Sequence, residues 1–196
     1  MLPKKFYENA INHLYQEELG EIITDDKNIY EELQQLYAGN PDILSKIRFY
    51  ENDAISLGTL YSFETQIQRA ISERVWMKSG AYLIIQPTEA LTVIDVNSGK
   101  NTSGKNAEEY YYKINLEAAA EISRQLRLRN ISGIVIVDFI NMAKEEQRKE
   151  LMHQFRLSLK EDPVPVRLVD ITKLGLVELT RKKERKTLLE QVAQLR

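Results

Sequence analysis

Apolar residues along the chain recur with two periods, one typical of strands and one typical of helices. Two short apolar runs, LTVIDV at 91–96 and GIVIVD at 133–138, are rich in β-branched residues, which indicates strands. We expect both strands to be buried on both faces, because continuous apolar runs are typical of such strands. Over 106–129 the apolar residues repeat at helical spacing. The order strand, helix, strand predicts a parallel pair joined by a crossover helix.

Further elements are predicted on both sides of this unit. The pattern favours helices over 4–19, 27–38, 62–72, 143–160 and 184–195. It favours strands over 21–24, 46–51, 163–172 and 175–183, and three strands joined by two turns over 74–97. This mixture predicts an α/β (α+β) fold in two parts, 1–72 and 73–196.

Polar residues follow each apolar run at the point where the strand should end. Asp95 and Asn97 end the first run, and Asp138, 43 positions after Asp95, ends the second. The carboxyl ends of parallel strands meet at one edge of a sheet, where open sheets bind ligands. Carboxylates suit magnesium, which is commonly held by only one or two of them. The pair of aspartates is therefore predicted to bind a hard cation at this edge.

Asp138 and Trp76 each have a structural interpretation as well. An aspartate at the end of a strand often forms a turn or caps the next helix. Because Asp138 precedes the predicted helix over 143–160, capping is the alternative for this residue. Trp76 lies in a predicted strand, where a tryptophan either packs in the core or stacks on a nucleobase.

The amino-acid composition is typical of a soluble globular protein and argues against several other classes of protein. The chain has 196 residues, of which 43% are hydrophobic and 29% are charged, as in soluble globular proteins. It contains no cysteine, which excludes disulfides and thiolate zinc sites within this chain. No apolar run approaches the roughly 18 residues that a membrane helix needs. The N-terminus lacks the apolar segment of a signal peptide, so we expect a cytoplasmic location.

Charge is distributed unevenly along the chain. Residues 1–53 carry 11 acidic and 5 basic residues, a net charge of −6, and residues 54–196 carry 18 acidic and 22 basic residues, a net charge of +4. A basic half fits contact with RNA, and a solvated face is the alternative. We expect RNA phosphates to be bound beside the carboxylates by six residues: Lys100, Lys105, Lys173, Arg181, Lys182 and Lys183.

Three stretches of the chain resemble one protein family, in the family's order and spacing. They are TEALTVIDVNSGK at 88–100, NLEAAAEISRQLRLRNISGIVIVDFINM at 115–142 and ITKLGLVELTRKK at 171–183. All three are similar to the catalytic core of the bacterial ribonuclease E/G family of endoribonucleases. The resemblance is close over residues 60–183 and weaker over the N-terminal third.

This resemblance implies a fold, a site and a reaction. It implies a DNase I-like catalytic subdomain at 73–196, preceded by a partial RNase H-like subdomain at 1–72. Asp95 and Asp138 match the family's magnesium ligands, and Asn97 matches the residue that orients the first carboxylate, so these three are the implied catalytic residues. The implied reaction is magnesium-dependent hydrolysis of single-stranded RNA that leaves 5′-phosphate and 3′-hydroxyl ends.

The sequence also departs from the family pattern. The S1 domain, the 5′-end sensor and the zinc-binding CPxC segment have no counterpart in it, so the chain resembles a shortened catalytic core. A homo-oligomer is expected for the full-length protein only. Asn141 stands where family members often carry an aspartate. The alternative functions are a non-catalytic RNA-binding or assembly module with the ribonuclease fold, and a protein in which the cation only stabilises the sheet.

Overall fold

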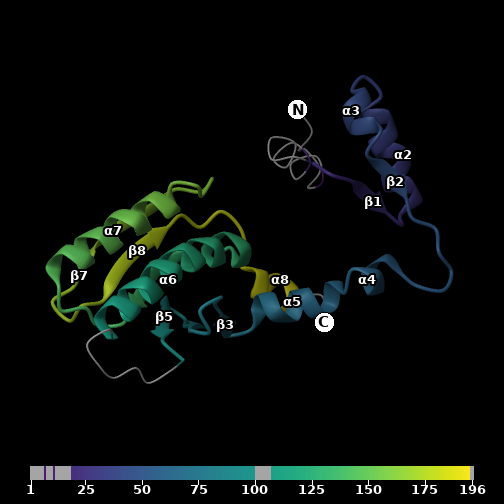
Figure 1. Ribbon diagram of the computed structural model, residues 1–196. Coiled ribbons are helices and arrows are strands. Elements are labelled where there is room, and N and C mark those ends of the chain that lie inside the picture. The colour runs from purple at the N-terminus through teal and green to yellow at the C-terminus, as the bar shows by residue number, and fades with distance from the viewer. Residues whose placement is uncertain (1–6, 8–10, 12–18, 100–106, 195–196) are drawn as a thin grey trace. The chain divides into compact units, whose positions relative to one another are not determined.

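The computed structural model describes residues 7, 11, 19–99 and 107–194 of a chain that divides into two compact units (Figure 1). The first unit comprises Met1–Thr65 and the second Gln66–Arg196. The division falls inside helix α5 (Phe63–Ile71), seven residues before the boundary predicted between 72 and 73. No helix in the described ranges is long and apolar enough to cross a membrane.

The first unit combines short helices with a two-stranded sheet. Its elements are β1 (Ile22–Thr24), α2 (Lys27–Leu36), α3 (Pro41–Leu44), β2 (Ile47–Phe49) and α4 (Leu57–Leu60). β1 and β2 pair in parallel. Five buried side chains form a core within this unit: Ile11, Leu33, Tyr37, Ile43 and Ile47. The helix predicted over 4–19 lies outside the described residues, apart from Tyr7 and Ile11.

A six-stranded mixed sheet forms the centre of the second unit. Its strands, in the spatial order β3-β4-β5-β6-β8-β7, are β3 (Arg74–Trp76), β4 (Tyr82–Pro87), β5 (Leu91–Asn97), β6 (Gly133–Asp138), β8 (Val177–Arg181) and β7 (Val166–Ile171). β5 and β6 run parallel, and the other neighbouring strands are antiparallel. Helix α6 (Ala107–Arg129) joins β5 to β6, which confirms the predicted crossover.

Helices α6 and α7 (Glu145–Leu159) lie side by side on one face of this sheet (Figure 1). Alternate strand residues, such as Leu83, Ile94 and Val137, are fully buried together with apolar residues of these helices. The intervening strand residues are half-buried or exposed. The expected burial of β5 and β6 on both faces is therefore wrong, because the helices of the described residues cover one face.

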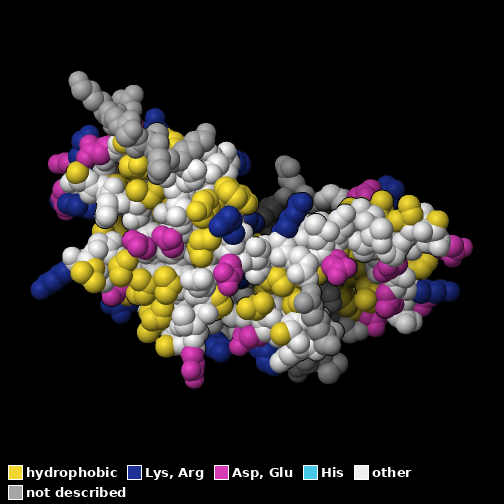
Figure 2. Space-filling view, turned by 90° about the horizontal axis from the view of Figure 1, so that it is seen from below, with side chains coloured by type: hydrophobic (Ala, Val, Ile, Leu, Met, Phe, Trp, Pro, Cys, Tyr) yellow, Lys and Arg dark blue, Asp and Glu magenta, His cyan; other side chains and the backbone are white. Residues whose placement is uncertain are grey.

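The other face, which we call the open face, carries the remaining side chains of the strands. They include Arg74, Trp76, Tyr82, Ile84, Val93, Asp95, Asn97, Ile134, Ile136 and Asp138. Ile134 and Trp76 are among the most exposed large hydrophobic residues of the chain, at 48% and 62%. Seen from below the view of Figure 1, hydrophobic side chains gather at the surface beside charged ones (Figure 2). The second unit is completed by the short helix α8 (Leu188–Gln194).

Candidate active site

Asp95 and Asp138 occupy neighbouring positions on the two parallel strands. They are direct register partners of β5 and β6. Paired residues of neighbouring strands point to the same face, and their strands lie about 4.8 Å apart. Both aspartates are exposed, because each alternates with buried residues that face the helices. The predicted placement of the two aspartates side by side at the ends of parallel strands is confirmed, and both side chains lie on the open face.

Asn97 holds one of these carboxylates in place. Its Nδ2 donates a hydrogen bond of 2.8 Å to Oδ2 of Asp95. The two residues lie on the same face because they are two positions apart on one strand. This bond fixes the orientation of the Asp95 side chain and leaves Oδ1 for another ligand. The arrangement is the one that the resemblance implies for Asn97.

Asp138 does not cap the helix that follows it. Helix α7 begins at Glu145, and its N-cap position is occupied by Lys144, six residues after Asp138. An N-cap side chain accepts a hydrogen bond from the backbone N–H of the second or third helical residue. Asp138 is not in the N-cap position, because it lies six residues before Lys144. The capping interpretation of Asp138 is therefore excluded, and its carboxylate ends a strand at the exposed sheet edge.

Asn115 fixes the segment that follows Asp138, and sequence reasoning missed it. This residue lies on α6 and is fully buried. Its Nδ2 donates to the Ile140 carbonyl at 2.7 Å, and its Oδ1 accepts from the Ile140 amide at 3.0 Å. One side chain thus satisfies both backbone groups of a residue two positions beyond the metal-ligand candidate. The available signal was a polar residue beside Ile114 on the apolar side of the predicted helix.

The donor set of the Asp95–Asp138 pair fits magnesium. Two carboxylates project from neighbouring positions at the carboxyl ends of β5 and β6. Magnesium is usually held by one or two protein carboxylates, with water filling its other positions. Larger clusters are absent in the described ranges, where no group of three or more His, Cys, Asp or Glu residues is arranged to hold a metal. The pair therefore suits an ion that keeps several waters better than one that needs a complete protein cage.

Among the predicted RNA-binding residues that the structure describes, only Lys173 lies at the end of the sheet that carries Asp95 and Asp138. It is exposed in the turn between β7 and β8. β8 runs antiparallel to β6, with Val177 opposite Val137, so this turn lies at the Asp138 end of the strands. A Cβ added to Gly175 of the same turn would lie 3.9 Å from Oδ1 of Asn141. Lys100 and Lys105 lie outside the described residues.

Arg181 was predicted to bind RNA, and this prediction is wrong because its side chain is buried. Strand β8 alternates so that Val177, Leu179 and Arg181 face the helices. The guanidinium pairs with Asp162, with Nε 2.8 Å from Oδ2, and their side chains are only 3% and 1% exposed. A second nitrogen, Nη1, donates to the Ile131 carbonyl at 3.1 Å. Arg181 is therefore a structural residue that a phosphate cannot reach.

Lys182 and Lys183 lie at the wrong end of the sheet for the predicted contact. They follow Arg181, which pairs with Gly133 at the start of β6, whereas Asp138 is its last residue. Lys182 forms an exposed ion pair with Glu184 at 3.3 Å. The predicted location beside the carboxylates is therefore wrong for both lysines, because β8 runs in the direction opposite to β6.

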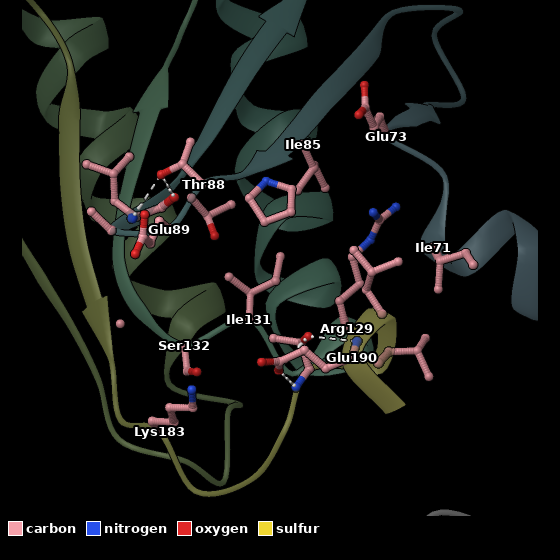
Figure 3. Close-up of a pocket in the computed structure, with 18 of the residues that line it drawn as sticks. Ile71, Glu73, Ile85, Thr88, Glu89, Arg129, Ile131, Ser132, Lys183 and Glu190 are labelled. Carbon is pink, nitrogen blue, oxygen red and sulfur yellow. Dashed lines mark hydrogen bonds between the residues drawn. The ribbon is translucent and has the colours of Figure 1, made fainter. Parts of the chain in front are cut away.

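A cavity of about 630 Å³ opens at this opposite end of the sheet (Figure 3). Lys183 lies near Ser132 on one side of it (Figure 3). Arg129 also lines it, and Nη2 of this side chain is buried with no hydrogen-bond partner among the described residues. Burial lowers the pKa of the Arg129 guanidinium. Because neither Asp95 nor Asp138 lines this cavity, it is separate from the carboxylate pair.

Curated relatives of the chain are bacterial ribonucleases. Ribonuclease G of Salmonella typhimurium (strain SL1344) is 39% identical over 171 residues, which are 87% of this chain and 35% of that protein. Ribonuclease E of Synechocystis sp. (strain ATCC 27184 / PCC 6803 / Kazusa) is 37% identical over 194 residues, 96% of this chain and 28% of that protein. Ribonuclease E of Escherichia coli (strain K12) is 36% identical over 176 residues, 89% of this chain and 16% of that protein. The chain thus spans about a third or less of the length of these relatives.

The match to the family as a whole extends over most of the chain. The sequence model of the Ribonuclease E/G family matches residues 3–184, which include the sheet, the crossover helix and the Asp95–Asp138 pair. The extent of this match and the identity to ribonucleases G and E show that the chain belongs to the Ribonuclease E/G family.

Proposed function

We propose that the protein is a magnesium-dependent endoribonuclease that hydrolyses phosphodiester bonds of single-stranded RNA. The observation that carries this proposal is the register of Asp95 and Asp138, with Asn97 bonded to the first carboxylate, in a member of the Ribonuclease E/G family. Two of the proteins to which the chain is similar are named ribonuclease G and ribonuclease E. Since the chain spans only part of those proteins, the activity of this chain is a proposal in its own right.

Three side chains divide the work at this site. Asp95 and Asp138 would hold the ion, and Asn97 would orient the Asp95 carboxylate through the 2.8 Å hydrogen bond. When bound, magnesium supplies charge stabilisation for the reacting phosphate and a lowered pKa for a coordinated water. Asn115 holds the backbone after Asp138, which limits the movement of that carboxylate relative to its partner.

The remaining requirement is that RNA approaches the open face. Lys173 lies at the same sheet edge and is exposed, so it can pair with a phosphate of the bound strand. Single strands can present their bases to a flat protein surface, whereas the bases of a duplex stay stacked inside. The expected products carry a 5′-phosphate and a 3′-hydroxyl. A cytoplasmic location and a homo-oligomer of the full-length protein stay predictions.

A cleavage assay on a labelled, AU-rich single-stranded RNA tests the proposal. Purified protein should cut this RNA in the presence of magnesium and should stop when EDTA removes the ion. The downstream product should be joined to an RNA adaptor by a ligase that requires a 5′-phosphate, without prior treatment with a kinase. Such ligation would show that the product carries a 5′-phosphate. RNA binding without cutting at any magnesium concentration would instead favour the non-catalytic binding module. Cutting that continues in EDTA would show that the carboxylate pair does not work through a metal.

A further inference from the structure

Three open-face side chains next to the carboxylates form a cluster that the proposed metal site does not use. Arg74 and Trp76 lie on β3, on either side of the buried Val75, and Tyr82 of β4 is the register partner of Trp76. The Trp76 and Tyr82 ring centroids are 5.1 Å apart, and the ring planes meet at 58°. The Arg74 guanidinium carbon lies 4.6 Å from the Tyr82 ring centroid and 5.6 Å from that of Trp76.

The exposure of Trp76 shows that this cluster does not serve the core. Trp76 is 62% exposed and is not part of the buried apolar cluster of the second unit. A tryptophan has 150–250 Å² to bury, and this one leaves most of its side chain in solvent. Large exposed apolar side chains grouped on one face mark binding surfaces. The packing interpretation of Trp76 is therefore excluded for the described residues.

Arg74 gives the cluster a positive charge without an internal counterion. No ion pair within the described ranges involves Arg74, and the neighbouring Glu73 accepts a hydrogen bond from Gln86 instead. The guanidinium stacks over two aromatic rings and stays exposed. A guanidinium held in this way can bind a phosphate while the rings remain open to a planar group. The combination of exposed rings and an uncompensated cation suits a nucleotide better than an apolar protein segment.

The sheet places this cluster beside the carboxylates. Tyr82 is the register partner of Asn97, and Ile84, two residues further along β4, is the partner of Asp95. Trp76 is one strand further out, so it lies about 10 Å from the strand of Asn97, at two strand spacings. All of these side chains point to the open face. The aromatic rings therefore lie within reach of a nucleotide that neighbours a phosphate held at Asp95 and Asp138.

We infer that Trp76, Tyr82 and Arg74 form a base-stacking subsite that binds a nucleotide of single-stranded RNA next to the cleavage position. This inference rests on the proposed function and assigns a substrate contact to that site. Aromatic platforms with arginine bind single strands without reading sequence, because every base has a flat face that can stack. In a duplex the bases are stacked on each other, so the subsite selects single-stranded RNA.

Intrinsic fluorescence tests the subsite directly, because Trp76 is the only tryptophan in the chain. The protein is titrated in EDTA with an AU-rich single-stranded RNA carrying a remote label, so that binding and tryptophan emission are measured on one uncut sample. Stacking predicts saturable quenching of the emission that follows the binding curve. A duplex of the same sequence should bind without this quenching. Single-stranded RNA that binds with unchanged emission, or that fails to bind, overturns the inference.

Substitutions separate stacking from a loss of folding. Trp76→Ala should weaken binding of the single strand about 5- to 150-fold, the range for one stacked base, whereas Trp76→Phe should keep most of the affinity. Leu157→Ala is the matched control, because Leu157 is an exposed apolar residue of α7, which lies on the other face of the sheet. Equal loss in Trp76→Ala and Trp76→Phe, or no loss in either, contradicts stacking.

The outcome for the subsite is independent of the outcome for catalysis. If RNA quenches Trp76 but is never cut in magnesium, the proposed nuclease activity fails and the stacking subsite stands. If RNA is cut at the same KM by the wild-type protein and by Trp76→Ala, the activity stands and the subsite is overturned. A rise in KM with an unchanged kcat is the result expected of a residue that binds substrate and takes no part in bond breaking.

Discussion

Asp95 is held by Asn97, whereas no hydrogen bond or ion pair to the Asp138 carboxylate is found among the described residues. Asp138→Asn keeps the shape of the side chain and removes its charge. Cleavage should fall at least about 100-fold, since even the outer groups around a metal site contribute 10- to 100-fold. Folding should be retained, and stability without metal should rise slightly because two neighbouring carboxylates repel each other.

The control for Asp138→Asn is Asp25→Asn, which removes one exposed carboxylate from the first unit. Cleavage rates at saturating RNA and urea unfolding curves should be measured for both variants. RNA binding should survive in both, because phosphate contacts carry most of the affinity. A variant that folds, binds RNA and cuts at the wild-type rate would remove Asp138 from the site.

Arg181 and Lys182 are adjacent basic residues with opposite environments, which makes them a matched pair for stability. Arg181→Met should destabilise the protein by about 3–5 kcal/mol, because it leaves the Asp162 carboxylate buried without its partner. Lys182→Ala should change the free energy of unfolding by less than about 0.5 kcal/mol, since its ion pair with Glu184 is exposed. Urea unfolding measures both, and similar values for the two variants would contradict the assigned burial of Arg181.

The burial of Arg181 and the exposure of Lys182 could not be predicted from the sequence. A cluster of basic letters predicts a charged surface, but alternation along β8 decides which of them faces the helices. The burial of Arg181 depends on Asp162, which lies 19 residues upstream and becomes a neighbour only once the second unit has folded. In contrast, the Asp95–Asp138 pair was predictable, because it follows from two local strand patterns and one crossover helix.

At the scale of elements, α6 fixes the site through Asn115 as well as through packing. Asn115→Ala would leave the amide and the carbonyl of the half-buried Ile140 without these partners, at a cost of about 1 kcal/mol for each lost hydrogen bond. It should also lower cleavage, because the segment after Asp138 loses both hydrogen bonds that Asn115 makes to Ile140. Lys113→Ala, at an exposed position on the same helix, should change the free energy of unfolding by less than about 0.5 kcal/mol. It should leave the cleavage rate unchanged.

Thermal unfolding and cleavage rates should be measured on the two α6 variants together. An Asn115→Ala protein as stable as Lys113→Ala would show that Asn115 does not hold the segment. The sequence could not assign this role, because a buried asparagine becomes informative only when its partner, a loop residue 25 positions away, is known. Helical periodicity located α6 correctly and left the function of its one buried asparagine open.

The backbone at Gly80 lies close to the backbone at Gly99, just after the end of β5. Alanine substitutions at these two glycines test how closely the two turns must approach each other. Gly80 and Gly99 both have positive φ, at 85° and 69°, so alanine is strained at either position. At Gly99 an added Cβ would also lie 2.4 Å from the Gly80 carbonyl oxygen, whereas at Gly80 it would meet nothing within 4 Å. Gly80→Ala should cost about 1–2 kcal/mol from backbone strain alone, and Gly99→Ala should cost clearly more.

The difference between the glycine variants isolates the close approach of the two turns. It should appear in urea unfolding and, for Gly99→Ala, in a lower cleavage rate, because Gly99 lies two residues after Asn97. Equal destabilisation by both variants would mean that the turns separate without cost.

At the scale of the whole molecule, the residues that the structure describes form two hydrophobic cores that share no residue. The first unit has five buried apolar side chains in its described part, whereas the second has a far larger set running from Val75 to Leu179. The sequence predicted a boundary between 72 and 73, whereas the division into compact units falls inside α5, between Thr65 and Gln66.

Separate cores predict that a fragment of residues 62–196, which keeps α5 whole, folds without the first unit. A domain of that length buries enough surface to be stable alone, whereas a unit of about 65 residues is marginal. The intact protein should therefore unfold in urea in two steps, with the second step matching the midpoint of the fragment. Tryptophan emission follows only the second unit, since Trp76 belongs to it, and circular dichroism follows both. If the fragment is unfolded in buffer, or if both probes report one shared transition in the intact protein, the two units form a single cooperative structure and the proposed catalytic unit cannot act alone.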